Sequence, residues 1–441
     1  MTDKADPPDI HDSQAIEAIH VPHDPYLALR FRNFRVLLMG IFISQLGERM
    51  IDVAIGWELY QRTGSALALG WVGLSLVIPV IVLSLPAGHV VDRFNRKYIV
   101  MISQGGMALA SLGLTFLSLA GGPIVLIYGC LFLLGCASAF NSPASSTLIP
   151  HFVSAEAFEN AATWDSNIGQ LASVVGPALG GLLIALLGGA ALVYALNAAI
   201  ILLFIALLAP LRVKPLAPEQ RAGRLELEKT SKATTWESLV EGLRFLRSSQ
   251  VILAAITLDM FAVLLGGATT LLPIFAKDIL HVGPAGLGWM RAAPSIGAVC
   301  MSLVIAHMPP FKKAGRTLLL TVIGFGAATV IFGISRQFWL SLLMLFLLGG
   351  FDNISVVIRS TLLLTRTPNA LLGRISAINF IFIGASNELG GFESGVTAQL
   401  FGPVISVAGG GIGTILVVLL VALIWPEMRR LGGLGVERKP T

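Results

Sequence analysis

The chain has 441 residues, of which 55% are hydrophobic and only 12% are charged, and its mean hydropathy is +0.81. A soluble domain carries about 25% charged residues, so this composition excludes an ordinary water-soluble globule. The net charge of +5 does not indicate a nucleic-acid partner, because such binding needs a basic patch on a soluble face. The Lys and Arg residues here occupy short loops, tails and one linker. The composition predicts an all-α membrane protein.

Long stretches without any Asp, Glu, Lys or Arg support this prediction. One runs from Tyr98 to Ala155, and another runs from Ser166 to Leu211. Each can hold two bilayer-spanning helices of about 20 residues. The apolar runs of the whole chain predict twelve transmembrane helices. They are expected at 36–60, 67–91, 98–120, 123–149, 160–187, 190–210, 250–276, 284–306, 317–335, 338–363, 375–400 and 404–425.

The predicted helices form two six-helix halves, residues 36–210 and 250–425, with a polar linker at 211–249 between them. Residues 1–35 and 426–441 are expected to form the N-terminal and C-terminal tails. Paired halves of this kind suggest parallel repeats about an axis along the membrane normal. A substrate site is then expected at their interface, near the middle of the bilayer.

The linker contains one predicted amphipathic helix, at 234–248. Thr234 and Glu237 have the spacing of a capping box, and apolar residues follow at one-face helical spacing. We expect this helix to lie on the surface of the bundle. The alternative is a helix that binds a partner.

The distribution of basic residues predicts the orientation. Most of the 30 Lys and Arg residues lie in the tails and the even-numbered connections, whereas the odd-numbered connections hold Arg62, Lys277 and Arg336. Such an excess places both termini in the cytoplasm. We therefore predict a multi-pass protein of the cell inner membrane.

The loop between the second and third helices reads Gly-His-Val-Val-Asp-Arg-Phe-Asn-Arg-Lys, over residues 88–97. It resembles the G-x-x-x-D-R-x-G-R-K/R signature of the major facilitator superfamily. Glycine allows a close helix approach, aspartate suits the positive end of a helix dipole, and basic residues hold the loop in the cytoplasm. The residues for which the resemblance implies a gating role are Gly88, Asp92, Arg93, Arg96 and Lys97.

The loop departs from the signature at Asn95, where the family favours glycine. Asparagine tolerates a left-handed backbone conformation, so we expect the loop to keep its shape. The resemblance implies that Asp92 meets the N-terminus of the eleventh helix when the cytoplasmic side closes. The matching loop at 309–316 is basic but has no aspartate, so the second copy of the signature is degenerate.

The fifth helix carries Ala-x-x-x-Gly-Pro-Ala-Leu-Gly-Gly at 172–181. This is similar to the G-x-x-x-G-P-x-x-G-G motif of exporting, antiporter members of the superfamily. Small residues allow helices to pack closely in lipid, and proline removes a backbone hydrogen bond. Ala172 replaces the first glycine, and the fourth helix lacks the arginine that proton-coupled drug antiporters often carry. The matching residues are Gly176, Pro177, Gly180 and Gly181.

Further segments, at 45–50, 63–70, 351–353 and 367–374, resemble the exporter branch that includes enterobactin and macrolide efflux proteins. The resemblance implies a secondary transporter that exports amphiphilic small molecules, of the drug or siderophore type, in exchange for protons by alternating access. The alternatives are an importer or symporter, or a lipid flippase, of the same fold. A more remote alternative is a membrane-embedded enzyme.

Ionisable residues inside the predicted helices are the main candidates for function, because a charge at the bilayer centre costs at least ~2.5–3.5 kcal/mol. At about 1.5 Å per residue, several acids are expected near the middle of the bilayer. By resemblance, the acids on helices 1, 7 and 10 face the central cavity. The predicted proton or substrate pathway comprises Glu48, Asp52, Asp259, Asp352 and Glu388.

Each acid could instead belong to a structural ion pair. Arg359 follows Asp352 by two helical turns, so these two side chains could pair. Arg291 and Glu393 are expected at similar depth, and we interpret them as an interhelix bridge or an outer gate. A carboxyl group desolvated in a cavity can exchange protons near neutral pH. The acids without an assured partner, and so the first candidates for coupling, are Glu48, Asp259 and Glu388.

Other chemistry finds no support in the sequence. No G-x-x-x-x-G-K-S/T loop for ATP occurs, and Cys130, Cys136 and Cys300 lack the spacing of a metal or redox motif. We expect no enzymatic activity, no metal and no cofactor. The expected partners are a small-molecule substrate, protons and the lipid bilayer, but no nucleic acid, and we expect a monomer.

Overall fold

The computed structural model describes residues 24–211, 235–309 and 311–433, which are helical and contain no strand. The N-terminal half consists of η1 (Ala28–Arg30), α1 (Arg32–Thr63), α2 (Ala66–Arg93), α3 (Arg96–Leu119), α4 (Ile124–Ser146), η2 (Ile149–His151), η3 (Ala155–Ala157), α5 (Phe158–Leu187) and α6 (Ala191–Leu208). The C-terminal half consists of α8 (Thr235–Ser248), α9 (Gln250–Leu265), η4 (Gly267–Thr269), α10 (Leu272–Ile274), η5 (Phe275–Ile279), α11 (Gly283–Ala306), α12 (Ala314–Ile334), α13 (Phe338–Arg366), α14 (Asn369–Phe401), α15 (Pro403–Ile424) and α16 (Pro426–Arg430).

The prediction of twelve membrane-spanning helices in two halves is confirmed. In the part of the chain that the structure describes, ten helices are long and apolar enough to cross a membrane, judged by length and composition. The other two, α1 and α14, have 32 and 33 residues and carry several charged side chains. A charge inside a membrane must face protein or a cavity, so these two helices are expected to line the functional site.

The seventh span was predicted to be one continuous helix over 250–276, but the structure shows a broken one. Helix α9 ends at Leu265, and η4, α10 and the π-helical η5 complete the crossing. The break falls at Gly266 and Gly267, where the backbone packs tightly against neighbours. A Cβ on Gly266 would lie 2.8 Å from the Phe325 ring, and one on Gly267 would lie 2.6 Å from the Gly390 carbonyl oxygen.

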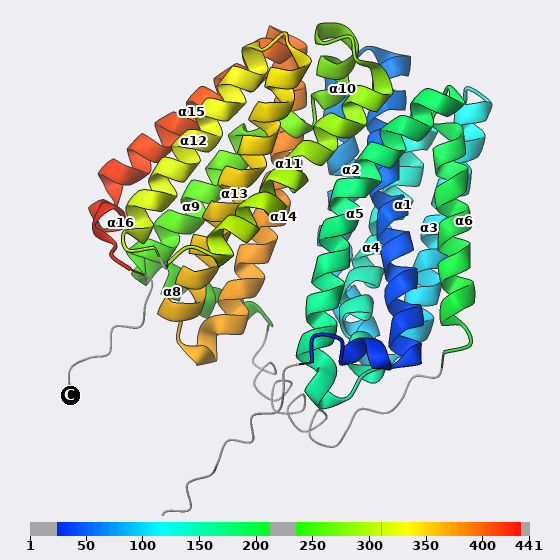
Figure 1. Cartoon of the computed structure of the whole chain (residues 1–441), viewed down its shortest axis with the longest axis horizontal. Helices are drawn as coiled ribbons and strands as arrows, with labels where there is room; N and C mark the ends of the chain where they lie inside the picture. Colours follow the sequence, from blue (N-terminus) through cyan, green and yellow to red (C-terminus); the bar gives the residue numbers. More distant parts are fainter. Residues whose placement is uncertain (1–23, 212–234, 310, 434–441) are drawn as a thin grey trace, which may run out of the picture.

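Among the described residues, a hydrophobic core shared by the two halves occurs on only one side of the molecule. We call the side that carries η1, α8 and α16 the terminal side, and the opposite side the far side. On the far side a single cluster joins residues of both halves, such as Leu59 and Tyr194 with Leu272 and Phe332. On the terminal side each half has a cluster of its own. The ribbons accordingly meet on the far side and diverge toward the terminal side (Figure 1).

Close helix pairs hold the far side together. Helix α2 packs on α14, and α5 packs on α11. A Cβ on Gly70 would lie 3.2 Å from the Phe392 backbone, and the rings of Trp71 and Phe392 meet edge to face at 5.3 Å. The Tyr60 hydroxyl, at the end of α1, donates to the Asp278 carboxylate of the other half.

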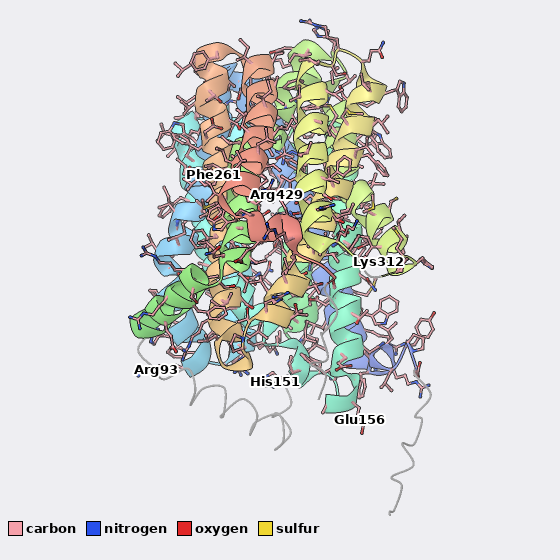
Figure 2. The ribbon with its side chains drawn as sticks, turned by 90° about the vertical axis from the view of Figure 1, so that its left-hand side faces the viewer. Arg93, His151, Glu156, Phe261, Lys312 and Arg429 are labelled. Atoms are coloured by element: carbon pink, nitrogen blue, oxygen red, sulfur yellow. The ribbon has the colours of Figure 1, made fainter. Side chains whose placement is uncertain are left out.

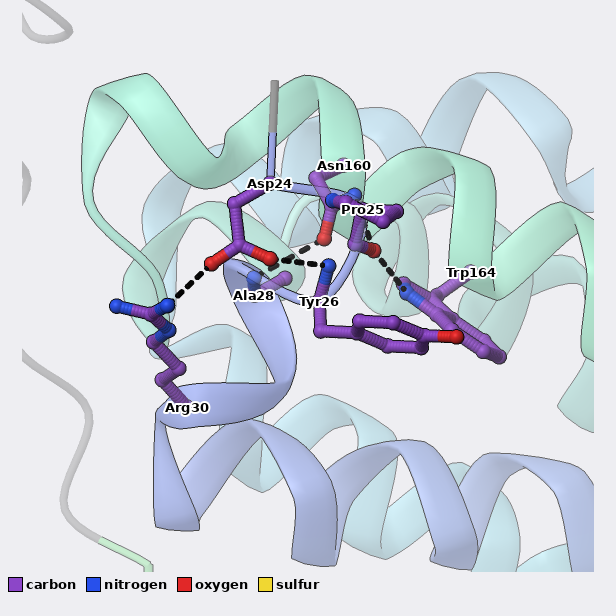
Figure 3. Close-up of polar contacts among 7 residues, drawn as sticks. All are labelled: Asp24, Pro25, Tyr26, Ala28, Arg30, Asn160 and Trp164. Carbon is purple, nitrogen blue, oxygen red and sulfur yellow. Dashed lines mark hydrogen bonds and ion pairs between the residues drawn. The ribbon is translucent and has the colours of Figure 1, made fainter. Parts of the chain in front are cut away.

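The N-terminal segment is fastened to the terminal end of α5, as Figure 3 shows. The Pro25 carbonyl accepts from the Asn160 amide at 2.8 Å and from the Trp164 indole at 3.1 Å. The Ala28 amide donates to the Asn160 side-chain oxygen at 3.0 Å. Figure 2 shows His151 and Glu156 near this end of the molecule, while large apolar side chains project from the sides of the bundle.

The amphipathic linker helix is present as α8, while Thr234 of the predicted capping box lies outside the described residues. Leu246 is buried in a small cluster with Ile375 and Ile378 of α14. The Glu241 carboxylate also forms an ion pair with Arg374. The helix therefore lies on the C-terminal half, which agrees with the surface position expected from its sequence.

Candidate functional site

A cavity of about 440 Å³ lies between the two halves. This volume is within the range of about 300–1,000 Å³ that is usual for small-molecule sites. Its wall combines charged and amide groups with aliphatic side chains. The polar side chains are Arg49, Asp52, Thr269, Thr270, Arg291, Asn387 and Glu388, and the aliphatic ones include Ile55, Leu69, Val72 and Leu76.

The charged residues form what we call the central cluster, Arg49, Asp52, Arg291 and Glu388. Arg49 and Asp52 come from α1, and their Nη1 and Oδ2 atoms are 3.8 Å apart. Arg291 comes from α11, and it interacts electrostatically with both Asp52 and Glu388. Its Nε atom is buried and has no hydrogen-bond partner among the described residues, so this guanidinium retains donor capacity. The N-terminal and C-terminal halves thus each contribute one cation and one anion.

Glycines set the positions of these side chains. A Cβ on Gly176 of α5 would collide with the Arg49 side chain, and one on Gly73 of α2 would collide with the Glu388 carboxylate. A Cβ on Gly56 would lie 3.8 Å from Nη2 of Arg291. The Arg49 and Glu388 side chains therefore occupy space that a Cβ would fill, whereas Gly56 leaves ordinary contact distance to Arg291.

The break in the seventh span contributes Thr269 and Thr270, which the sequence analysis did not identify as site residues. The sequence feature that could have identified them is Gly266-Gly267, because an apolar segment interrupted by glycine indicates the binding site in transporters of this architecture. The unwound backbone brings both residues to the cavity wall. Arg49 and Asn387 were also missed as site residues.

Among the predicted pathway residues, Asp52 and Glu388 line the cavity. Glu48 lies on α1 within electrostatic range of Arg49 and Asp52. Asp259 and Asp352 line a separate space of about 10 Å³ inside the C-terminal half. That space is about the size of one water probe, so these two acids do not face the central cavity in this conformation.

Two predicted pairings require correction. Arg359 forms its ion pair with Asp259 of α9, and not with Asp352 on its own helix. Asp259 is therefore not an acid without a partner. Both side chains are only 8% exposed, and the Arg359 Nε also donates to the Ser355 carbonyl at 3.3 Å. The sequence showed only the spacing along one helix, whereas the pair joins two.

The proposed bridge between Arg291 and Glu393 does not form within the described residues. Arg291 lines the cavity together with Asp52 and Glu388 and interacts electrostatically with both. Glu393 accepts a hydrogen bond from the neighbouring Ser394 hydroxyl at 3.5 Å. A different contact, between Tyr60 and Asp278, connects the two halves on the far side. No sequence spacing links a tyrosine of the first span to an acid at the end of the seventh.

The loop between α2 and α3 is fixed by its polar side chains. Asn95 has φ −67°, so it is not left-handed as expected, and its side chain accepts from the Lys97 amide at 3.0 Å to cap α3. Lys97 Nζ donates to the Ala209 carbonyl at 2.6 Å, near the end of α6. Arg96 contacts His151 at 2.7 Å. The basic residues thus tie the loop to two other helix ends.

Gly88 does not make the close approach expected of it in this conformation. A Cβ at this position would meet no described atom within 4 Å. Asp92 belongs to the last turn of α2 and Arg93 is its exposed final residue, while the side chain of Asp92 lies outside the described parts.

The glycine motif of α5 is a packing site for two helices. A Cβ on Gly180 would lie 2.9 Å from the Cα of Met50 on α1. A Cβ on Gly181 would lie 2.7 Å from the Cα of Gly288 on α11, and the Pro177 carbonyl is next to Gly288 in turn. The same motif therefore positions Arg49 and joins the two halves on the far side.

A buried polar group near the far end of α1 was not predicted either. Glu58 is 8% exposed and pairs with Arg62 at 3.3 Å, and it shares a hydrogen bond with Tyr194 of α6. Arg62 also donates to the Gly122 carbonyl. Because these groups satisfy one another, they stabilise the N-terminal half and lie apart from the central cluster.

Two six-helix halves around a charged central cavity define a secondary transporter of the major facilitator fold. The transmembrane secretion effector family matches residues 23–431. The chain therefore belongs to this family, and it is a multi-pass membrane transporter and not an enzyme.

Individual relatives agree with this assignment. The enterobactin exporter EntS of Citrobacter koseri is 28% identical over 402 residues, covering 90% of this chain and 92% of that protein. EntS of Escherichia coli O81 is 27% identical with the same coverage.

Solved structures show the same fold at low identity. A bacterial homologue of the human lysosomal transporter Spinster, inward-facing and unoccupied, has a TM-score of 0.68 at 13% identity, covering 92% of this chain and 98% of that one. A D-xylose-proton symporter has a TM-score of 0.66 at 14% identity, covering 91% and 100%.

Proposed function

We propose that this chain exports an amphiphilic small molecule of the siderophore type in exchange for protons, and that the central cavity is its binding site. The observation that carries the proposal is the central cluster, because residues of both halves converge there on one cavity. Guanidinium and carboxylate groups suit the polar part of a substrate, and the aliphatic wall suits its apolar part. The relatives that export enterobactin support the substrate class.

The excess of Lys and Arg supports a cytoplasmic position of the terminal side in the cell inner membrane. With this orientation, the shared far-side core is periplasmic and the conformation described above is inward-facing. Alternating access then requires the far-side core to separate while the two terminal-side cores approach each other. The cavity lies within one chain, which supports a monomeric transporter.

The proton carriers are proposed to be Asp52 and Glu388, with Glu48 beside them. Asp52 and Glu388 both interact with Arg291, so a substrate that binds this guanidinium competes with them. Protonation of a carboxyl group releases the arginine, and rebinding of the arginine releases the proton. Inward movement of one proton supplies about 2.3 kcal/mol per 100 mV. Asp259 and Asp352 are proposed to act through Arg359 inside the C-terminal half.

The gate is proposed to use the loop at 88–97, as the family resemblance implies. Asp92 lies at the end of α2, and α14 begins at Asn369 without an acidic residue in its first turn. An anion at a helix N-terminus contributes about 0.3–2 kcal/mol. Asp92→Asn is expected to favour the inward-facing state by roughly 2- to 30-fold. Spin labels on the terminal ends of α4 and α13 measure this shift, and unchanged distances with slowed transport would contradict the gate.

The test of the whole proposal is transport by the purified protein. Proteoliposomes with an acidic lumen and the terminal side facing outward are expected to accumulate a catecholate siderophore, and a protonophore is expected to stop accumulation. A screen of overexpressing and deletion strains against siderophores, antibiotics, dyes and metals tests the substrate class independently. If none of the compounds that the screen identifies accumulates in response to the proton gradient, proton-coupled export is overturned.

A further inference from the structure

A second hollow, of about 410 Å³, lies on the terminal side of the C-terminal half, away from the central cavity. It is bounded by the beginning of α12 and by α16. Three of its side chains are guanidinium groups and the others are apolar. The lining residues are Arg316, Leu319, Leu320, Pro426, Arg429 and Arg430.

The wall of this hollow is fixed by close packing. A Cβ on Gly315 would collide with the Met428 carbonyl oxygen, and Met428 is fully buried. The Ala314 amide donates to the Gly432 carbonyl at 3.1 Å. Helix α16 is therefore held against the first turn of α12, which sets Arg429 and Arg430 beside Arg316.

The hollow has unbalanced positive charge. Arg316, Arg429 and Arg430 form no ion pair within the described ranges, and Glu427 on α16 is exposed and likewise forms none there. Helix α12 has no acidic residue in its first turn, so the positive end of its dipole adds to this field. Figure 2 shows Arg429 on α16 and, near the start of α12, Lys312.

The hollow lies at the end of the last membrane-spanning helix. Helix α15 ends at Ile424 and Trp425 follows, and tryptophan is enriched at the boundary between lipid and water. Leu320, Leu423 and Ile424 are each at least 60% exposed, so the surface beside the arginines is apolar. A ligand here meets cations at one end and hydrocarbon at the other.

We propose that this hollow binds the headgroup of an anionic phospholipid, with its acyl chains against α12 and α15. Arginine recognises phosphate oxygens through two parallel hydrogen bonds, and basic pockets at the ends of transmembrane helices are suited to anionic headgroups. An acyl chain completes the fit, because the exposed leucines beside the arginines need an apolar neighbour. A free phosphate would leave them uncovered.

The experiment is a titration of the full-length protein, purified in detergent, with phosphatidylglycerol, followed by native mass spectrometry. Arg429→Gln/Arg430→Gln is expected to weaken the tightest site roughly 30-fold, and Arg316→Gln alone about fivefold. The matched control is Arg32→Gln/Arg35→Gln, which removes two exposed arginines from the terminal end of α1 and is expected to bind like wild type.

Three outcomes would overturn the proposal. The first is that Arg429→Gln/Arg430→Gln binds phosphatidylglycerol as tightly as wild type does. The second is that the wild-type protein binds phosphatidylcholine as tightly as phosphatidylglycerol. The last is that inorganic phosphate displaces the lipid at equal concentration. The last outcome would assign the hollow to a free anion. Thermal unfolding of each variant checks its fold, and the single Arg316→Gln variant decides the matter where the double variant is unstable.

Discussion

Two of the groups of charges within the described spans differ in their access to space. The central cluster lies between the halves at a cavity of about 440 Å³, and its Arg49 and Asp52 side chains are 52% and 45% exposed. The buried pair, Asp259 with Arg359, lies inside one half, with both side chains 8% exposed.

The difference in exposure determines what each group of charges can do. Charges that are enclosed and mutually satisfied resist separation, because either one alone would remain desolvated. Charges at an open cavity are stabilised by water and by one another, so a substrate or a proton can replace a partner at low cost. We therefore propose that the buried pair contributes stability and that the central cluster takes part in transport.

The largest expected effect is the loss of stability when the buried pair is broken. Arg359→Gln leaves Asp259 without its cation, which should lower the free energy of unfolding by about 3–5 kcal/mol. Asp259→Asn/Arg359→Gln should recover most of this loss. Unfolding in mixed micelles measures both, and Asp352→Asn is the control because it keeps the pair. A double variant as unstable as Arg359→Gln would show that the unpaired charge is not the cause.

The central cluster should give the opposite result. Arg291→Gln removes a guanidinium that faces the cavity, so export should fall roughly 10- to 100-fold. The loss of stability should be smaller than that of Arg359→Gln, because Arg291 borders an open cavity. Transport in proteoliposomes and unfolding of the same preparation measure the two effects. The control is Arg336→Gln, an exposed arginine before α13. A stability loss as large as that of Arg359→Gln would make Arg291 a structural residue.

Gly176 of α5 packs against the Arg49 side chain of the central cluster. Gly176→Ala introduces a methyl group where the Arg49 side chain packs, so overpacking should cost about 1–3 kcal/mol and displace the cation from its place in the cavity. Gly105→Ala is the matched control, since a Cβ on Gly105 meets nothing within 4 Å. Substrate affinity and unfolding are measured for both. Equal affinities in the two variants would separate this glycine from the site.

The smallest expected effect concerns the pair between Arg49 and Asp52. A double-mutant cycle with Arg49→Gln and Asp52→Asn should give a coupling free energy of unfolding of only about 0.2–1 kcal/mol, because both groups are about half exposed. The same cycle on Asp259 and Arg359 provides the reference. A coupling for Arg49 and Asp52 that reaches the value of the buried pair would remove the distinction between the two groups.

Much of the fold could be predicted because its signals are local. Twelve apolar segments follow from the cost of placing unsatisfied backbone or charge in lipid, and this cost is read along the chain. The motif of α5 was predictable in the same way, since closely spaced small residues indicate close helix packing. Asp52 and Glu388, which line the cavity, could be chosen as candidates because they are acids within apolar segments.

The partners of these residues could not be predicted, because they lie on other helices. Spacing on one helix suggested that Arg359 pairs with Asp352, but packing places Asp259 of α9 closer. Their similar expected depth in the membrane suggested that Arg291 meets Glu393, but the rotation of α11 places Arg291 at the cavity.

By itself, the sequence determined a twelve-helix membrane protein with acids in its spans, because hydrophobicity and the cost of a buried charge act residue by residue. Only the tertiary structure decided which charges are sealed in pairs and which face a cavity. It also showed that Gly176 seats Arg49 and that the broken seventh span contributes Thr269 and Thr270. The reason is that side-chain partners depend on how helices rotate and approach one another, and residues distant along the chain fix that rotation together.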